Sequence, residues 1–159
     1  MQVREAKQSD IKSIADLYEE LNSEHNALLP EIFRKAARAS IEWHIFSIFG
    51  NFNSIIFVAE EEEILGFAHI TVEQVKSNPM FEDRCYTWVH NICVRKEKRG
   101  QGIGRSLMKA AESWGAERGA KSIELTVWEA NEGALHFYES LSYITMNRHL
   151  TKSLSTEKN

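Results

Sequence analysis

One stretch constrains this chain more than any other: Arg99-Gly100-Gln101-Gly102-Ile103-Gly104-Arg105. A strand-like run, residues 85–94, precedes it, and apolar residues at helical spacing follow it as far as Trp114. Its closely spaced glycines let backbone N–H groups be presented without Cβ atoms in the way. A loop of free N–H groups that leads into a helix N-terminus binds anions, because unpaired donors and the helix dipole converge there. The stretch therefore predicts a site for a phosphate-bearing cofactor, to which the two arginines add positive charge.

Two common phosphate-binding patterns do not fit this stretch. A P-loop needs a Lys-Ser or Lys-Thr pair at the start of the helix, and the stretch has neither. The dinucleotide fingerprint G-x-G-x-x-G fails because, counted from Gly100, its last glycine falls on Arg105. The pattern [R/Q]-x-x-G-x-[G/A] does fit, as Arg99-x-x-Gly102-x-Gly104. In this the chain resembles the GNAT superfamily of N-acetyltransferases, whose loop binds the pyrophosphate of acetyl-CoA. A glycine-rich turn with surface arginines is the structural alternative.

A second segment, residues 131–143, resembles the GNAT signature N-x-x-A-x-x-F-Y-x-x-x-G-F. The matching positions are Asn131, Ala134, Phe137 and Tyr138. The final Gly-Phe of the signature is replaced by Ser142-Tyr143, so Ser142 carries strain if the turn needs a positive φ.

The resemblance implies roles for two residues of this segment. Asn131 contacts the arm of the cofactor, and Tyr138 lies at the sulfur atom as the general acid. Their spacing of seven residues, two helical turns, places both on nearly the same side of a helix. The structural alternatives are a helix N-cap for Asn131, which is compatible with cofactor contact, and a core position for Tyr138.

In the GNAT family the central strand splays away from its neighbour just before the loop, and its main-chain groups pair with the pantetheine arm and polarise the thioester carbonyl. The residues at this place are Ile92, Cys93 and Val94. Where relatives often have a carboxylate base, this chain has His90, whose ordinary pKa lies near the working pH. His90 is therefore either the group that deprotonates the amine or a histidine packed beside Trp88. Because the amine attacks directly, Cys93 is interpreted as a buried strand cysteine and not as a nucleophile.

The rest of the chain predicts alternating strands and helices. Strands are expected over residues 3–7, 54–60, 64–75, 85–94, 121–128 and 143–152, and helices over about 10–21, 30–49, 103–119 and 131–141. The fold class is α/β, a mixed and mostly antiparallel sheet splayed at its central strand and flanked by about four helices, as in GNAT acyltransferases. We expect one domain over residues 1–152 and a polar, disordered tail over residues 153–159.

Two further segments of the sequence, a predicted loop and an aromatic run, are interpreted as follows. Residues 22–30 are predicted to form a loop, with His25 facing solvent. The aromatic residues Trp43, Phe46 and Phe49 are interpreted as core packing, and the alternative is that they line an acceptor pocket.

Composition and charge limit the binding partners and the cellular location that we expect for this protein. The net charge of −4 and the lack of a basic stripe outside the loop argue against nucleic acid and mildly favour an amine substrate. Cys85 and Cys93 would lie roughly 26 Å apart along one strand, so they cannot pair. The chain shows no metal-ligand spacing, signal peptide or membrane-length apolar run. We therefore expect reduced thiols, no metal, no membrane association and a cytoplasmic location.

Together the motifs predict an enzyme that moves the acetyl group of acetyl-CoA directly to a primary amine of a small molecule or a peptide. One alternative is a catalytically silent module that binds acyl-CoA, and another is an unrelated nucleotide-phosphate-binding protein. A third is an acetylase of protein N-terminal alanine, but such enzymes carry a glutamate where this chain has Thr126, with Glu124 two positions earlier. Dimers are common among similar proteins, so a homodimer is left open.

Overall fold

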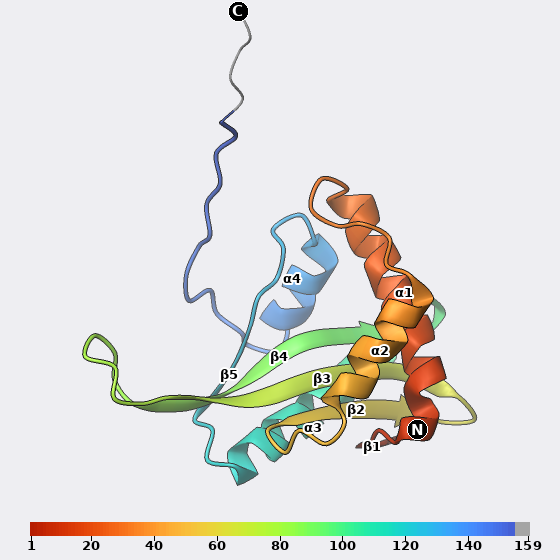
Figure 1. Ribbon diagram of the computed structural model, residues 1–159, viewed down its shortest axis with the longest axis horizontal. Coiled ribbons are helices and arrows are strands. Elements are labelled where there is room, and N and C mark those ends of the chain that lie inside the picture. The colour runs from red at the N-terminus through yellow and green to blue at the C-terminus, as the bar shows by residue number, and fades with distance from the viewer. Residues whose placement is uncertain (155–159) are drawn as a thin grey trace, which may run out of the picture.

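The computed structural model describes residues 1–154, in which an open sheet carries helices on both faces (Figure 1). The strands are β1 (Gln2–Glu5), β2 (Ser54–Glu60), β3 (Ile64–Val75), β4 (Arg84–Val94) and β5 (Ser122–Leu125). The helices are α1 (Ile11–Leu28), α2 (Arg38–Ile48), α3 (Ile103–Glu117) and α4 (Glu132–Glu139), with short 3₁₀ turns at Gln8–Asp10 and Lys96–Lys98. The order is β1-β2-β3-β4-β5, and every neighbouring pair is antiparallel except β4 and β5, which are parallel. The predicted mixed, mostly antiparallel sheet with four helices is confirmed.

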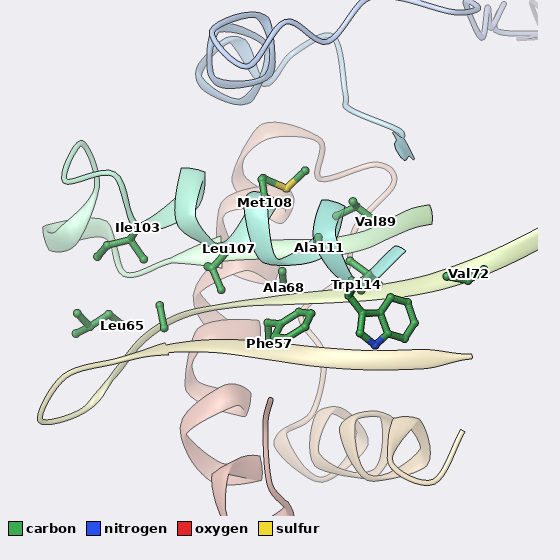
Figure 2. Packing of buried hydrophobic residues seen from close by; sticks show 12 residues of the cluster. Phe57, Leu65, Ala68, Val72, Val89, Ile103, Leu107, Met108, Ala111 and Trp114 are labelled. Atoms are coloured by element: carbon green, nitrogen blue, oxygen red, sulfur yellow. The ribbon is translucent and has the colours of Figure 1, made fainter. Parts of the chain in front are cut away.

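β2 and β3 carry near-continuous runs of apolar residues, and because successive side chains point to opposite faces, both faces of the sheet are buried. On one face α3 packs its apolar stripe against the sheet (Figure 2). The buried residues of this cluster include Phe57, Ala68, Leu107, Met108 and Trp114. On the other face α1 and α2 cover the sheet, with Ile14, Leu17 and Ile45 packed against Val58 and Phe67. Each such side chain contributes about 1.5–3 kcal/mol on burial, so both faces hold β3 and β4 firmly in the centre.

Two irregularities shape the centre of the sheet. Pairing between β4 and β5 ends at Val89 and Leu125, whereas pairing between β4 and β3 continues to Val94. The β3–β4 register also shifts, because Ile70 faces Val89 while His69 faces Asn91. His90 is therefore the extra residue of a β-bulge, and bulges re-aim the side chains beside them.

The boundaries of the first two helices differ from the prediction. α1 continues to Leu28, so the predicted loop at residues 22–30 is wrong, and α2 begins at Arg38 instead of Pro30. The side chains of Asn22 and Asn26 donate to the backbone carbonyls of Arg34 and Phe33, so residues 29–37 fold back along the last turns of α1. These contacts between distant residues offset the low helix propensity of asparagine.

The C-terminal part of the sheet also differs. β5 is shorter than predicted, and residues 143–152, expected to close the sheet, form no strand. Tyr143 packs against the α3 cluster, and the chain after it runs away from the body of the domain (Figure 1). The turn does need a positive φ at Ser142, where φ is 67°, so this serine holds a conformation that favours glycine. Beyond Leu154 the predicted disordered tail lies outside the described residues.

Candidate active site

The glycine-rich loop enters α3 in a conformation that only glycine adopts easily. Gly100 has φ of 76° and Gly102, the N-cap of α3, has φ of 82°. The first backbone bond of the helix runs from the N–H of Ser106 to the carbonyl of Gly102. The N–H groups of Ile103 and Gly104 precede that bond, so they are left without a partner in the helix and point out of its N-terminus. The loop therefore has the donors and the dipole that bind a pyrophosphate.

Position 104 requires a glycine for a steric reason and not for its backbone conformation. A Cβ atom there would lie 3.1 Å from Cζ of Phe137 and 3.8 Å from Cγ2 of Val94. The first turn of α3 is thus packed directly against α4 and against the end of β4. This contact brings together the three segments that carry the predicted site.

The two arginines of the loop have different surroundings. Arg99 donates from Nε to the carbonyl of Val94 at 2.9 Å, and its guanidinium nitrogens lie 3.3 Å from Glu20 and 2.8 Å from Glu24 on α1. Arg105 is close only to the carbonyl of Ser140, at 3.5 Å, among the described residues. Arg99 therefore fixes the loop to β4 and α1, while Arg105 is free to meet an anion.

A surface hollow of about 340 Å³ adjoins Arg105 between α3 and the C-terminal end of α4. Lys109, one helical turn after Arg105, and Glu112 also line it, so two cations and one carboxylate face the hollow. Another hollow, of about 320 Å³, lies between Phe49 and Trp114, at the end of α3 that is remote from the loop. Of these two hollows, only the first includes a residue of the predicted site, Arg105.

The edge of β4 next to the loop is open within the described residues, because no strand lies beside it beyond Val89. Ile92 and Val94 turn their side chains to the α3 face, and Cys93 is buried on the α1 face. Burial raises the pKa of the Cys93 thiol to about 12, so the sulfur is a protonated core atom. The main-chain edge of this segment, and not the cysteine, is what remains available to a ligand.

α4 holds the two residues of the second motif. Asn131 is the N-cap of this helix, and its side chain accepts a hydrogen bond from the N–H of Ala134 at 3.0 Å. Tyr138 is partly buried, with its ring 5.5 Å from the ring of Tyr143 and 5.1 Å from that of Phe137. Burial raises the pKa of the Tyr138 phenol to about 12, so it stays protonated across the physiological range. Its hydroxyl donates no hydrogen bond to another group of residues 1–154, so the proton is available to a ligand.

His90 lies on the α1 face of the sheet, which Thr71 and its register partner Trp88 share. Its ring stacks on that of His69 at 4.5 Å, and its Nε2 lies 2.9 Å from the hydroxyl oxygen of Thr71. That hydroxyl donates its one proton to Glu73 at 2.6 Å, so Nε2 of His90 is the donor to Thr71. Nδ1 of a neutral His90 therefore keeps its lone pair. Burial lowers the pKa of His90, and the Glu73 carboxylate opposes this with a smaller effect.

Three further residues of the site, His69, Thr71 and Glu73, carry no motif that predicts a functional role. They occupy alternate positions of β3, so their side chains share the α1 face of the sheet. The alternation was visible in the sequence, but the bulge that places His90 beside them was not. His69 is buried, with Nε2 3.0 Å from the hydroxyl of Ser54 and no partner for Nδ1 among residues 1–154.

Aromatic side chains connect the loop after α1 with the loop before α4. The ring of Phe33, in the loop after α1, lies 4.7 Å from His25 and 5.4 Å from Trp128, in the loop before α4. His25 is therefore partly buried and not a solvent-facing residue. The core interpretation is wrong for Trp43 and Phe46, which stack on each other at the surface of α2, 69% and 48% exposed.

Comparison with known proteins agrees with this arrangement. The family model for the acetyltransferase (GNAT) family matches residues 14–143. The uncharacterized N-acetyltransferase YhfO of Bacillus subtilis is 29% identical over 147 residues, which cover 90% of this chain and 89% of that protein. Two other curated relatives are matched over only 27% and 53% of their own length, so the chain corresponds to part of those proteins.

Solved structures share the whole fold. A tetramutant of the BH1408 protein from Bacillus halodurans superposes with a TM-score of 0.93 at 27% identity, covering 97% of this chain and all of that one. The aminoglycoside N-acetyltransferase AAC(6')-Iy in complex with CoA has a TM-score of 0.72 at 15% identity, over 98% and 100% of the two chains. The latter likeness shows the fold alone.

Residues 1–154 contain neither a membrane-spanning helix nor a metal-binding cluster. None of their helices is both long and apolar enough to span a bilayer. No group of His, Cys, Asp and Glu side chains in this part of the chain is arranged to hold a metal ion.

Proposed function

The chain belongs to the GNAT family of acetyl-CoA-dependent N-acetyltransferases, and on that premise we propose that it transfers the acetyl group directly to a primary amine of a small molecule or a peptide. The observation that carries the proposal is the open edge of β4. Between Val89 and Val94 this edge lies free of β5, next to the glycine loop and next to the helix that carries Tyr138. A thioester placed there meets main-chain donors, a phosphate site and a phenol at once.

Acetyl-CoA is held by main chain more than by side chains in this proposal. The free N–H groups at the start of α3 and the cation of Arg105 bind the pyrophosphate. The exposed edge of Ile92–Val94 pairs with the pantetheine arm and polarises the thioester carbonyl. Gly100 and Gln101 complete the loop, and Asn131 contributes to the arm from the N-terminal end of α4 while it caps that helix. Arg99 acts through the loop that it fixes.

His90 is the proposed general base. A lysine-like amine has an ordinary pKa of about 10.4, so it gives one proton to solvent to become the neutral nucleophile, and a second proton must leave as its nitrogen bonds to the acetyl carbon. The lone pair on Nδ1 can take that proton, because the other ring nitrogen is held as a donor by Thr71 and Glu73. The lowered pKa keeps the imidazole neutral near pH 7. Glu73 then stabilises the imidazolium through Thr71.

Tyr138 is the proposed general acid. The amine nitrogen bonds to the acetyl carbon while the amine proton passes to His90, and the bond from that carbon to sulfur then breaks. The departing thiolate takes the phenolic proton of Tyr138 and leaves as CoA, with the acetylated amine as the second product. After the products leave, His90 returns its proton to solvent and Tyr138 takes one from it, so that a phenol with a pKa of about 12 is again fully protonated before the next turnover.

The protein N-terminus alternative is disfavoured by the contacts of Glu124. Its carboxylate lies 2.8 Å from Arg84 and accepts from Ser122 as well. A carboxylate that is already paired is a poor substitute for the missing glutamate at Thr126.

The test is acetyl-CoA-dependent thiol release against polyamines, amino acids, aminoglycosides and short peptides with free N-termini. Tyr138→Phe should lower kcat by about 10²- to 10³-fold and leave the Kd for acetyl-CoA unchanged. Tyr143→Phe is the matched control, because the Tyr143 hydroxyl is buried without a partner among residues 1–154 and should be dispensable. Intact acetyl-CoA binding with no amine-dependent release would favour the silent acyl-CoA-binding module. Tighter binding of ATP or NAD than of acetyl-CoA would contradict the proposal.

A further inference from the structure

The carboxylate of Glu73 lies close to the proposed base and carries a charge that no neighbour balances. Its Oε1 accepts a hydrogen bond from the hydroxyl of Thr71 at 2.6 Å, and it forms no ion pair within residues 1–154. The same hydroxyl lies 2.9 Å from Nε2 of His90. Glu73 is therefore two hydrogen bonds away from His90, on the far side of the ring from the Nδ1 that takes the amine proton.

Two aromatic side chains of β4 lie beside this carboxylate. Tyr86 is directly opposite Glu73 in the β3–β4 register, and Trp88 is the next residue of β4 on the same face. Directly opposed residues have Cβ atoms about 4.5–5.5 Å apart, and diagonal neighbours about 7–8 Å, which long side chains span. The two rings meet edge to face, with their centroids 6.4 Å apart. Glu73 thus has one ring directly opposite and a second ring on the diagonal.

No described helix covers this part of the sheet. The half of β3 and β4 that carries these residues extends past α2 toward the turn that joins the two strands (Figure 1). Glu73, Tyr86 and Trp88 are half-buried, and neither ring belongs to the apolar cluster on either face of the sheet. A carboxylate attracts a cation by charge, and an aromatic ring attracts it through the negative face of its π system. This face therefore suits a cationic ligand.

The one arginine on this part of the face leaves Glu73 free. The guanidinium carbon of Arg84 lies 4.5 Å from the centroid of the Tyr86 ring. Its two terminal nitrogens lie 2.8 Å and 3.3 Å from the carboxylate oxygens of Glu124, so these two charges balance each other. Within residues 1–154 the ring of Trp88 and the carboxylate of Glu73 have no cationic partner.

We propose, resting on the function proposed above, that the acceptor is a small diamine whose second nitrogen binds as a cation between Glu73 and Trp88. One nitrogen is neutral and attacks the thioester beside His90, while the other keeps its proton and takes no part in the bond changes. Because Glu73 is only two hydrogen bonds from the base, a spacer of a few methylene groups joins the two nitrogens. Glu73 is therefore a specificity-determining residue that acts mainly on the KM for the acceptor.

The test compares three acceptors that share a four-carbon amine and differ only at its far end. Diaminobutane carries an ammonium group there, aminobutanol a hydroxyl and aminobutyrate a carboxylate. Thiol release from acetyl-CoA gives kcat and KM for each, at one pH at which His90 is neutral. The wild type should use diaminobutane about five- to thirtyfold more efficiently than aminobutanol, chiefly through a lower KM. Aminobutyrate should be the poorest acceptor, because Glu73 repels its carboxylate.

Three variants identify the contact. Glu73→Gln should bring kcat/KM for diaminobutane to within about threefold of that for aminobutanol. Any effect that this change has through Thr71 and His90 alters kcat for all acceptors alike, so the ratio between acceptors isolates the second cation. Trp88→Leu should lower the preference by about two- to fivefold. Glu82→Gln removes a carboxylate from the exposed turn of the same hairpin and should keep the wild-type preference.

Two results would overturn this inference and leave the proposed function intact. Equal KM values of the wild type for diaminobutane and aminobutanol would show that no second cation is bound. A preference that survives unchanged in Glu73→Gln would place the cation elsewhere. If none of the amines is acetylated although acetyl-CoA binds, the proposed transfer itself fails, and this inference fails with it.

Discussion

Gly104 on α3 and Phe137 on α4 lie so close that a Cβ atom at position 104 would be 3.1 Å from the phenylalanine ring. The loop proposed to bind the pyrophosphate and the helix proposed to deliver the catalytic phenol are therefore one packed unit. The residue after Phe137 is Tyr138, so a displacement of that ring is transmitted to the phenol.

Gly104→Ala should consequently harm catalysis as well as stability. We expect a loss of about 1–3 kcal/mol from overpacking and a decrease of roughly ten- to a hundredfold in kcat as Tyr138 moves. Thermal unfolding and thiol-release kinetics measure both effects. Phe137→Leu should restore part of each. Gly133→Ala is the control: the nearest atom to a Cβ there is 3.9 Å away, so the change should be neutral or stabilising. Equal effects of the two glycine variants would contradict this account.

Substitutions of the two loop arginines should differ in their effects on stability and on the affinity for acetyl-CoA. Arg99→Gln removes the bonds to Val94 and to the α1 carboxylates, so both the free energy of unfolding and the affinity for acetyl-CoA should fall. Arg105→Gln should reduce the affinity by about three- to thirtyfold at low salt and leave stability within about 0.5 kcal/mol of wild type. Calorimetric titration and chemical unfolding give the two quantities. If Arg105→Gln binds acetyl-CoA normally, Arg105 has no part in the anion site.

Much of this arrangement could be predicted because it depends on neighbours in sequence. The left-handed Gly102, the N-cap Asn131 and the positive φ at Ser142 are local requirements of a turn or a helix end. The hairpin formed by residues 54–60 and 64–75 follows from alternating side chains and an acidic turn.

What could not be predicted depends on contacts between distant segments. One extra residue in β4 places the ring of His90 on that of His69 of β3. The pairing of Arg99 with Glu24 needs α1 to continue beyond its predicted end.

The pH profile of kcat/KM should distinguish His90 from its structural alternative. Because burial lowers the pKa of His90 below its ordinary value of about 6.5, the acid limb of the profile should lie below that pH. Glu73 raises this pKa, so Glu73→Gln should move the limb to still lower pH. Tyr138, with a pKa of about 12, should cause no loss of activity between pH 8 and about 10.

The control for this profile is His90→Asn, which should abolish the acid limb together with most of the activity. An acid limb that remains in His90→Asn with near-normal kcat would assign the base to another group.

His69 should make the fold less stable in mild acid. Burial lowers its pKa to about 3, with smaller effects from His90 and His44 in the same direction. In the unfolded chain the imidazole takes a proton near pH 6.5, so between those values the unfolded state binds more protons than the native state. Stability is therefore complete above about pH 6.5 and falls with pH by about 1.4 kcal/mol per unit for this one proton. Urea unfolding at pH 7.0, 5.5 and 4.5 should show this slope in the wild type and a slope smaller by that amount in His69→Gln. His136→Gln, at an exposed position on α4, should keep the wild-type slope, and a matching decrease there would mean that burial of His69 is not the cause.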